Sequence, residues 1–228
     1  MTTFTPDTIL GDIVTADPAN ARILDRFGID YCCHGQRSVA NACAASSIDA
    51  NELLNALGTA RTAQRPEWAD LNDVSLIAHI VSTHHRFLWN EFPRMAELVD
   101  KVARVHGANH SELTRVRDAF HELRAAVEPH LRTEETLLFP QISMRSATPH
   151  EPLSSELRAE LSQNLTEHDR AGELLAELRQ ITNGFAVPPD ACGSYKAMLA
   201  GLEEIEKDLH MHVHKENNVL FTRVLASA

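Results

Sequence analysis

One pattern of residues occurs twice and decides the fold. His130–Phe139 reads HLRTEETLLF, and His212–Phe221 reads HVHKENNVLF. Each copy has a histidine, a glutamate four residues later, and then an aliphatic residue, Leu and Phe at the same spacing. Residues four apart lie on one face of an α-helix, so each copy presents its histidine and glutamate side by side. The repeat predicts two equivalent helices that contribute the same pair of polar groups.

Four long segments contain or flank these copies, and all of them have the apolar spacing of amphipathic helices. They cover about residues 73–105, 110–144, 153–182 and 190–225, and none alternates as a strand would. Short connections between long helices make neighbours antiparallel, so the sequence predicts an all-α, up-down-up-down four-helix bundle. Pro93, Pro129 and Pro140 lie inside these segments, and we expect kinks there because proline removes a backbone hydrogen bond.

The first 57 residues predict a small helical domain of their own. Asp17-Pro18 is typical of a helix start and Gly28 of its end, while further helices are expected near Ser38 and after Asp49. Residues 58–72 are expected to be a linker, because GTARTAQRPEW (58–68) is polar and interrupted by proline. The bundle domain then spans 73–228.

The bulk composition narrows the class of protein. The chain has 228 residues, 43% of them apolar, so it can bury a core, and its net charge of −11 argues against binding nucleic acid. No stretch approaches the roughly 18 apolar residues that span a bilayer, which predicts no membrane segment. The N-terminus lacks the basic and apolar regions of a secretory signal, so we expect a cytoplasmic protein.

Metal-capable side chains interrupt the apolar stripe of every predicted bundle helix. They are His85 on the first helix, His130 and Glu134 on the second, His168 on the third, and His212 and Glu216 on the fourth. A single histidine on such a stripe is more often a hydrogen-bonded core residue, and a single His–Glu pair is more often a surface contact. Helical phase alone does not separate His85 from His84.

The combination of these groups favours a metal centre. Ionised glutamate is almost never fully buried unless it is paired or binds a metal. Four imidazoles and two carboxylates can hold two metal ions if each metal takes two histidines and both glutamates bridge. An oxide or hydroxide can complete the bridge, which favours iron over zinc. Six protein ligands leave coordination positions open, which indicates small-molecule chemistry.

The same residues resemble a known family. The segments IVSTHHRFLWNEFP, PHLRTEETLLFP, EHDRAGELL and HVHKENNVLFTR, with the turn GIDYCCHGQRSVANAC (28–43), are similar to the motifs of the iron–sulfur cluster repair diiron proteins. That family joins a hemerythrin-like bundle to a small N-terminal domain with a YCC turn. The resemblance covers nearly the whole chain and implies six iron ligands, namely His85, His130, Glu134, His168, His212 and Glu216.

Two positions refine the resemblance. The family has proline eight residues after its first ligand, and Pro93 therefore selects His85 over His84. Oxygen-carrying hemerythrins have a second histidine on the third helix, where this chain has Gly172. That difference argues against plain oxygen carriage and favours the more open repair-type site.

The resemblance implies a protein that holds two iron ions and helps to restore iron–sulfur centres damaged by nitrosative or oxidative stress. Two chemistries stay open: reduction of nitric oxide to nitrous oxide at the diiron site, and donation of iron to a damaged cluster. Whether the protein is an enzyme therefore also stays open. The implied partners are damaged iron–sulfur proteins, an electron donor, and nitric oxide or oxygen as ligand. An alternative is a module that binds or senses nitric oxide or oxygen without turnover, and a third is a metal-free bundle with hydrogen-bonded core histidines.

The adjacent cysteines Cys32 and Cys33 are the second candidate site. They lack the spacing of a zinc motif. One interpretation is a reactive thiol pair that accepts iron, passes electrons or nitrosyl groups, or meets a client protein. The other is one buried and one exposed thiol. His34 stands where the family more often has glycine, while Cys43 and Cys192 are expected to be ordinary apolar residues.

Polar neighbours of the predicted ligands are expected to matter less. Glu167, Asp208 and Asn217 are placed to orient ligand histidines, but solvated helix surface is the favoured interpretation for each. Glu135 and His214 fall off the inward face of their helices and are expected at the surface.

Overall fold

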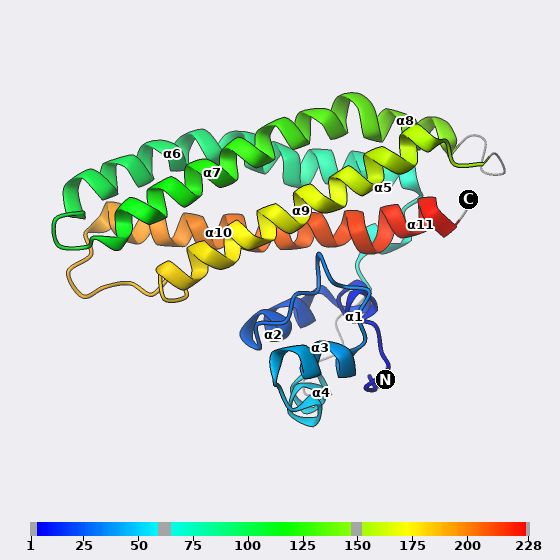
Figure 1. Ribbon diagram of the computed structural model, residues 1–228, viewed down its shortest axis with the longest axis horizontal. Helices are drawn as coiled ribbons and strands as arrows, with labels where there is room; N and C mark the ends of the chain where they lie inside the picture. Colours follow the sequence, from blue (N-terminus) through cyan, green and yellow to red (C-terminus); the bar gives the residue numbers. More distant parts are fainter. Residues whose placement is uncertain (1–3, 59–64, 147–151, 227–228) are drawn as a thin grey trace. The chain divides into compact units, whose positions relative to one another are not determined.

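The structure, a computed structural model, describes residues 4–58, 65–146 and 152–226. Regular structure in these ranges is helical, apart from an isolated β-bridge between Ile9 and Ser38 (Figure 1). The all-α prediction is therefore confirmed. None of the described helices combines the length and the apolar character needed to cross a lipid bilayer.

The chain divides into two compact units. One comprises Met1–His79, Arg145–Leu153 and Met211–Ala228, and the other comprises Ile80–Met144 and Ser154–His210. The first unit thus combines N-terminal helices with the C-terminal end of the chain, and the second holds most of the long helices. The predicted domain limits at 57 and 73 stay a prediction.

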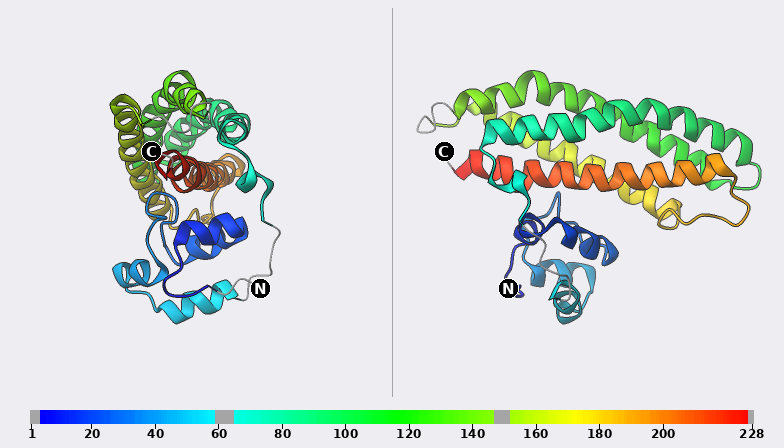
Figure 2. Two further views of the ribbon diagram at one scale, coloured as in Figure 1. Left: turned by 90° about the vertical axis from the view of Figure 1, so that its right-hand side faces the viewer. Right: turned by 180° about the vertical axis from the view of Figure 1, so that it is seen from behind.

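Long helices follow from residue 73, most of them in the second unit, and they match the four predicted segments. The helical segments along residues 73–226 are α5 (Asp73–Ile80), α6 (Arg86–His106), α7 (Glu112–Thr133), α8 (Phe139–Arg145), α9 (Ser155–Ile181), α10 (Gly193–Lys215) and α11 (Phe221–Ala226). Helices α6, α7, α9 and α10 lie side by side and run alternately up and down (Figures 1 and 2). The bundle predicted from apolar spacing is present.

Apolar side chains from all four of these helices form one core. Phe92 of α6 and Phe120 of α7 are fully buried and meet edge to face, with ring centroids 6.0 Å apart. Burying each side chain of this size contributes about 1.5–3 kcal/mol, so the stripe of each helix explains its place in the bundle. Pro93 and Pro129 lie inside α6 and α7, which continue through them.

Three π-helical segments interrupt the long helices, and the sequence pattern did not predict them. Segment η3 (Val81–His85) joins α5 to α6, η4 (Glu134–Leu138) joins α7 to α8, and η5 (Glu216–Leu220) joins α10 to α11. Each contains one of the predicted metal ligands at an end: His85, Glu134 or Glu216. π-helical turns are rare and occur often at functional sites.

Short helices form the N-terminal part, as α1 (Leu10–Ala16), the 3₁₀ turn η1 (Pro18–Asn20), α2 (Ala21–Arg26), α3 (Val39–Ser46) and α4 (Ala50–Gly58). The predicted starts hold: the side chains of Asp17 and Ser38 accept hydrogen bonds from backbone N–H groups of their helices, and Gly28 has φ of 65°. Helix α1 was not predicted, and no side chain in the described part of the chain caps its start.

Part of the predicted linker is structured. Residues 59–64 lie outside the described residues, but Glu67–Asp70 form the 3₁₀ turn η2. Arg223 of α11 donates hydrogen bonds to the backbone carbonyls of Leu71 and Ala69, at 2.6 and 2.7 Å. These bonds fix the segment that leads into α5.

Candidate metal centre

Side chains from two π-helical segments meet on the inner side of the bundle. His85 and Glu134 are fully buried, and Nε2 of His85 lies 3.4 Å from Oε2 of Glu134. The other carboxylate oxygen, Oε1, lies 3.3 Å from Nε2 of His130, one helical turn earlier on α7. The carboxylate of Glu134 therefore faces two imidazoles at once, as a bridging ligand must.

His168 of α9 extends this group. Its Nε2 atom lies 3.0 Å from Nε2 of His130, and the two rings are edge to face with centroids 4.8 Å apart. His168 is 2% exposed. Two ring nitrogens thus converge on one point from different helices.

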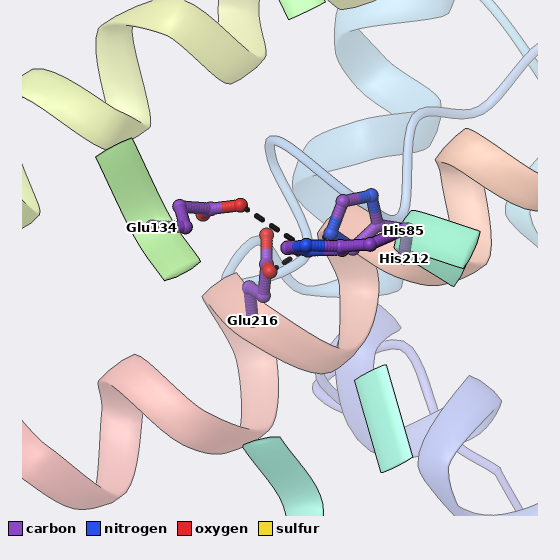
Figure 3. Close-up of side chains that lie close together, drawn as sticks. All are labelled: His85, Glu134, His212 and Glu216. Carbon is purple, nitrogen blue, oxygen red and sulfur yellow. Dashed lines mark hydrogen bonds and ion pairs between the residues drawn. The ribbon is translucent and has the colours of Figure 1, made fainter. Parts of the chain in front are cut away.

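The second copy of the repeated pattern supplies His212 and Glu216, both buried, with Nε2 of His212 2.9 Å from Oε1 of Glu216. Figure 3 shows these two with His85 and Glu134, their nitrogen and oxygen atoms directed toward one another. Potential ligand atoms lie within 4.8 Å of one another in two groups, His85–Glu134–His212–Glu216 and His130–Glu134–His168–Glu216. The structure thus brings together all six residues selected from the sequence, and both glutamates belong to both groups.

The donor set fits a metal ion. Glu134 is 0% exposed, and within the described residues neither of its carboxylate oxygens accepts a hydrogen bond. A buried ionised carboxylate in that state is costly unless a cation balances it. Imidazole nitrogens and carboxylate oxygens are ligands that suit first-row transition metals such as iron.

Glu135 orients the ring of His85. Its Oε1 atom lies 2.9 Å from Nδ1 of His85 and also accepts a hydrogen bond from the indole N–H of Trp89, at 3.0 Å. An ionised carboxylate can only accept, so Nδ1 of His85 donates and the lone pair of Nε2 points toward Glu134. Glu135 lies at the surface, as expected, but its contact with His85 was not foreseen.

Glu167 holds His130 in the same way. Oε2 of Glu167 lies 2.7 Å from Nδ1 of His130, and this hydrogen bond is the main reason that the pKa of Glu167 is lowered. The favoured interpretation of Glu167 as solvated surface was therefore wrong. The missed signal is spatial: Glu135 and Glu167 are each adjacent in sequence to a ligand but orient a histidine of another helix.

Two further surface expectations were wrong. Asp208 pairs with His84, whose Nδ1 atom lies 2.8 Å from Oδ1, so it orients the histidine beside the candidate ligand rather than the ligand itself. Asn217 is 9% exposed, and its side-chain amide donates to the backbone carbonyl of Cys32 at 3.3 Å. His85, and not His84, belongs to the cluster.

His214 was also expected at the surface, yet it is fully buried. Its ring lies edge-on to those of Tyr31 and Trp68, with centroids 6.0 Å away in each case, and Nε2 lies 3.2 Å from the hydroxyl of Thr15. Burial lowers the pKa of His214 to about 3, so the ring is neutral at physiological pH.

The two adjacent cysteines lie on a tight turn. Oδ1 of Asp30 accepts hydrogen bonds from the backbone N–H groups of Cys32 and Cys33, at 3.0 and 2.9 Å, and from the Cys32 thiol at 3.3 Å. Cys32 is buried, and Cys33 is half-buried. The hydrogen bond to Cys33, burial and nearby negative charge raise the pKa of Cys32 well above its usual value. His34 contacts the other oxygen of Asp30, with Nδ1 at 2.6 Å.

The remaining cysteines are unlike each other. Cys43 is buried among the apolar residues of the N-terminal part, as expected. Cys192 is exposed, and its sulfur lies 3.1 Å from Nε2 of His106, so it is not an ordinary apolar core residue.

Comparison with known proteins gives matches along nearly the whole chain. Residues 76–224 match the model of the hemerythrin HHE cation binding domain, and residues 6–61 match a domain of unknown function. The iron-sulfur cluster repair protein ScdA of Staphylococcus epidermidis is 34% identical over 226 residues, which cover 96% of this chain and 99% of the relative. ScdA of Staphylococcus haemolyticus is 31% identical over 221 residues, 96% of this chain and 98% of the relative. The iron-sulfur cluster repair protein YtfE of Escherichia coli is 32% identical over 226 residues, 96% and 97% of the two chains.

Proposed function

This chain belongs to the family of iron–sulfur cluster repair proteins and carries a hemerythrin HHE cation binding domain, and from that premise we propose that it is a cytoplasmic diiron protein. Its function is to restore iron–sulfur centres damaged by nitrosative or oxidative stress. The observation that carries the proposal is the pair of four-residue groups that share Glu134 and Glu216.

The six side chains fall into two ligand sets, one for each of two iron ions. His85 and His212 would hold one metal, and His130 and His168 would hold the other, because these are the pairs that occur together in the two groups. Glu134 and Glu216 belong to both and are assigned as bridges. When bound, two iron ions would supply reversible electron transfer and open coordination positions for nitric oxide or oxygen.

The surrounding residues keep the ligands in one orientation. Glu135 and Glu167 accept hydrogen bonds from Nδ1–H of His85 and His130, which directs the Nε2 lone pairs inward. Phe139 stacks on His85, with ring centroids 5.6 Å apart. These contacts hold the imidazoles in place without metal, so ordering the site costs little on binding.

Two chemistries are compatible with this site: reduction of nitric oxide with electrons from a donor protein, and donation of iron as a substrate to a damaged cluster. The first requires turnover at resident iron, and the second consumes iron. Nitrous oxide formed in molar excess over protein supports reduction. Stoichiometric loss of iron from the protein as the cluster recovers supports donation.

The experiment that tests the proposed function uses an iron–sulfur enzyme inactivated by nitric oxide. Wild-type protein is expected to restore its activity, and the Glu134→Ala variant is not. Glu128→Ala, in α7 just before η4 and paired with Arg124, is the matched control. Stoichiometric binding of nitric oxide with no recovery by wild-type protein would instead favour the sensing module.

A further inference from the structure

We propose that Asp30, Cys32 and Cys33 form a second metal site, which binds one thiophilic divalent ion such as Fe²⁺ or Zn²⁺. All three lie on the turn between α2 and α3, and their potential ligand atoms lie within 4.8 Å of one another. This site goes beyond the proposed function, because it takes no ligand from the six residues of the bundle cluster.

The spacing of the three side chains suits a single tetrahedral ion. The sulfur atoms of Cys32 and Cys33 are 3.9 Å apart. Two thiolates about 2.3 Å from a tetrahedral metal lie about 3.8 Å apart, so little movement is needed. Oδ1 of Asp30 lies 3.3 Å from the Cys32 sulfur, against about 3.6 Å expected for a thiolate and a carboxylate on one such ion.

The turn itself brings neighbouring thiols to one side. Adjacent residues in an extended chain point in opposite directions, but here Oδ1 of Asp30 binds the N–H groups of both Cys32 and Cys33 and folds the backbone around its carboxylate. His34 holds the other carboxylate oxygen.

A second set of contacts fixes the turn from outside. The side-chain amide of Asn218 donates to the backbone carbonyls of Tyr31 and Cys32, at 3.2 and 3.0 Å. Gly35 leaves room for this contact, because a Cβ atom there would come within 2.3 Å of the Tyr31 carbonyl oxygen and 2.4 Å of Oδ1 of Asn218. The ligands are therefore held before any ion binds.

The chemistry of the three groups selects the ion. Two thiolates favour soft or borderline metals, and a third, carboxylate ligand leaves a tetrahedral site with one open position. On binding, the Cys32 and Cys33 thiols each lose a proton to solvent, and two metal–sulfur bonds replace the two S–H bonds. Because one coordination position is open, an incoming ligand can bind the ion and remove it from the site. A closed structural site does not allow this.

Co²⁺ is the probe, added without oxygen to full-length protein with a reductant that is not a thiol. Iron-loaded wild-type protein, whose bundle cluster is already occupied, is expected to bind one further equivalent and develop thiolate-to-cobalt charge-transfer absorption, which excess Zn²⁺ abolishes by displacing the Co²⁺. Cys33→Ser, at a half-buried position, should abolish the absorption, and Asp30→Asn should weaken binding at least tenfold. Cys192→Ser is the control and should keep both the absorption and the binding affinity of the wild type. Circular dichroism checks that each variant is folded.

The double variant Glu134→Ala/Glu216→Ala separates this site from the bundle cluster. This variant should lose the iron of the bundle cluster and still develop the thiolate-to-cobalt absorption. The two proposed sites are therefore tested independently of each other. No charge-transfer absorption in wild-type protein, or undiminished absorption in Cys33→Ser, would overturn the proposal. Failure of excess Zn²⁺ to displace the Co²⁺ would also overturn it.

Discussion

Glu135 and His85 are joined by a hydrogen bond of 2.9 Å that connects the π-helical segments η4 and η3 beside the candidate metal centre. His85 is fully buried, whereas the side chain of Glu135 is 34% exposed. The carboxylate therefore reaches inward from the rim to fix which nitrogen of His85 carries the proton. Such contacts decide how firmly a ligand is held, although they touch no metal.

Removing this contact should weaken metal binding without unfolding the bundle. Glu135→Ala frees the His85 ring, and we expect metal affinity to fall about 10–100-fold. Competition with a chelator, followed by metal analysis, measures the change. Glu128→Ala on the same helix should leave the affinity unchanged, and an equal loss in both variants would contradict the specific role of Glu135.

The pair of Arg179 and Glu206 should contribute to stability away from the metal. Glu206 is 1% exposed, and Nε of Arg179 donates to it at 2.8 Å. Breaking a fully buried pair costs roughly 3–5 kcal/mol, but Arg179 is 40% exposed, so Arg179→Met should lower the free energy of unfolding by about 2 kcal/mol. Urea denaturation measures this loss.

Arg170→Met is the matched control for that experiment. Arg170 is 52% exposed and pairs with Glu122 and Glu173 at the surface, so its loss should cost at most about 1 kcal/mol. An equal loss of unfolding free energy in both variants would show that the burial of Glu206 does not set the contribution of its pair with Arg179.

His110 gives a prediction about pH. Its ring contacts Asp190 at 3.0 Å and Glu112 at 3.0 Å, and the hydrogen bond to Asp190 is the main cause of its raised pKa. The folded protein therefore holds this proton more tightly than the unfolded chain. The resulting stabilisation of the folded state is complete at pH values below 6.5, the ordinary pKa of histidine. It is lost as the pH rises through the raised pKa of His110 in the folded protein.

Titration of the His110 ring by nuclear magnetic resonance checks this shift. The midpoint should lie above 6.5 in the wild type and fall in Asp190→Asn. A midpoint at or below the ordinary value in the wild type would mean that the ring does not pair with Asp190 in solution.

Removing the thiols of Cys32 and Cys33 should not affect iron binding by the bundle cluster. Cys32→Ala combined with Cys33→Ala removes neither imidazole nor bridging carboxylate, so iron bound by the bundle cluster should stay while repair of damaged clusters is impaired. Metal analysis and the reactivation assay measure the two effects. Loss of bundle iron in this variant would mean that the role assigned to the thiols, or the predicted domain boundary, is wrong.

The helices and the six clustered side chains could be predicted because both follow from helical periodicity. A polar residue at the position of a core residue, such as His168 seven residues after Leu161 and seven before Leu175, stands out whatever the surroundings. The repeated His–Glu spacing then showed that two helices presented the same pair. Periodicity reports which face of a helix turns inward, and the site is built from inward faces.

The parts that were missed depend on contacts that periodicity does not contain. A π-helical turn changes the hydrogen-bond pattern and leaves no separate sequence signal, so η3, η4 and η5 were not foreseen. His214 lies off the bundle stripe of α10, but it is covered by Tyr31 and Trp68 from the N-terminal part. A face that is outward in the bundle alone is therefore not necessarily exposed.

The most direct test of the central claim is the iron content of purified protein, with its optical spectrum. The wild type should hold about two irons per chain, because six ligands with two bridging carboxylates fit a pair of ions. Glu134→Ala and Glu216→Ala should each lose most of this iron, while Glu204→Ala, at an exposed position of α10, should keep it. Unchanged iron content in both bridge variants would contradict the diiron assignment.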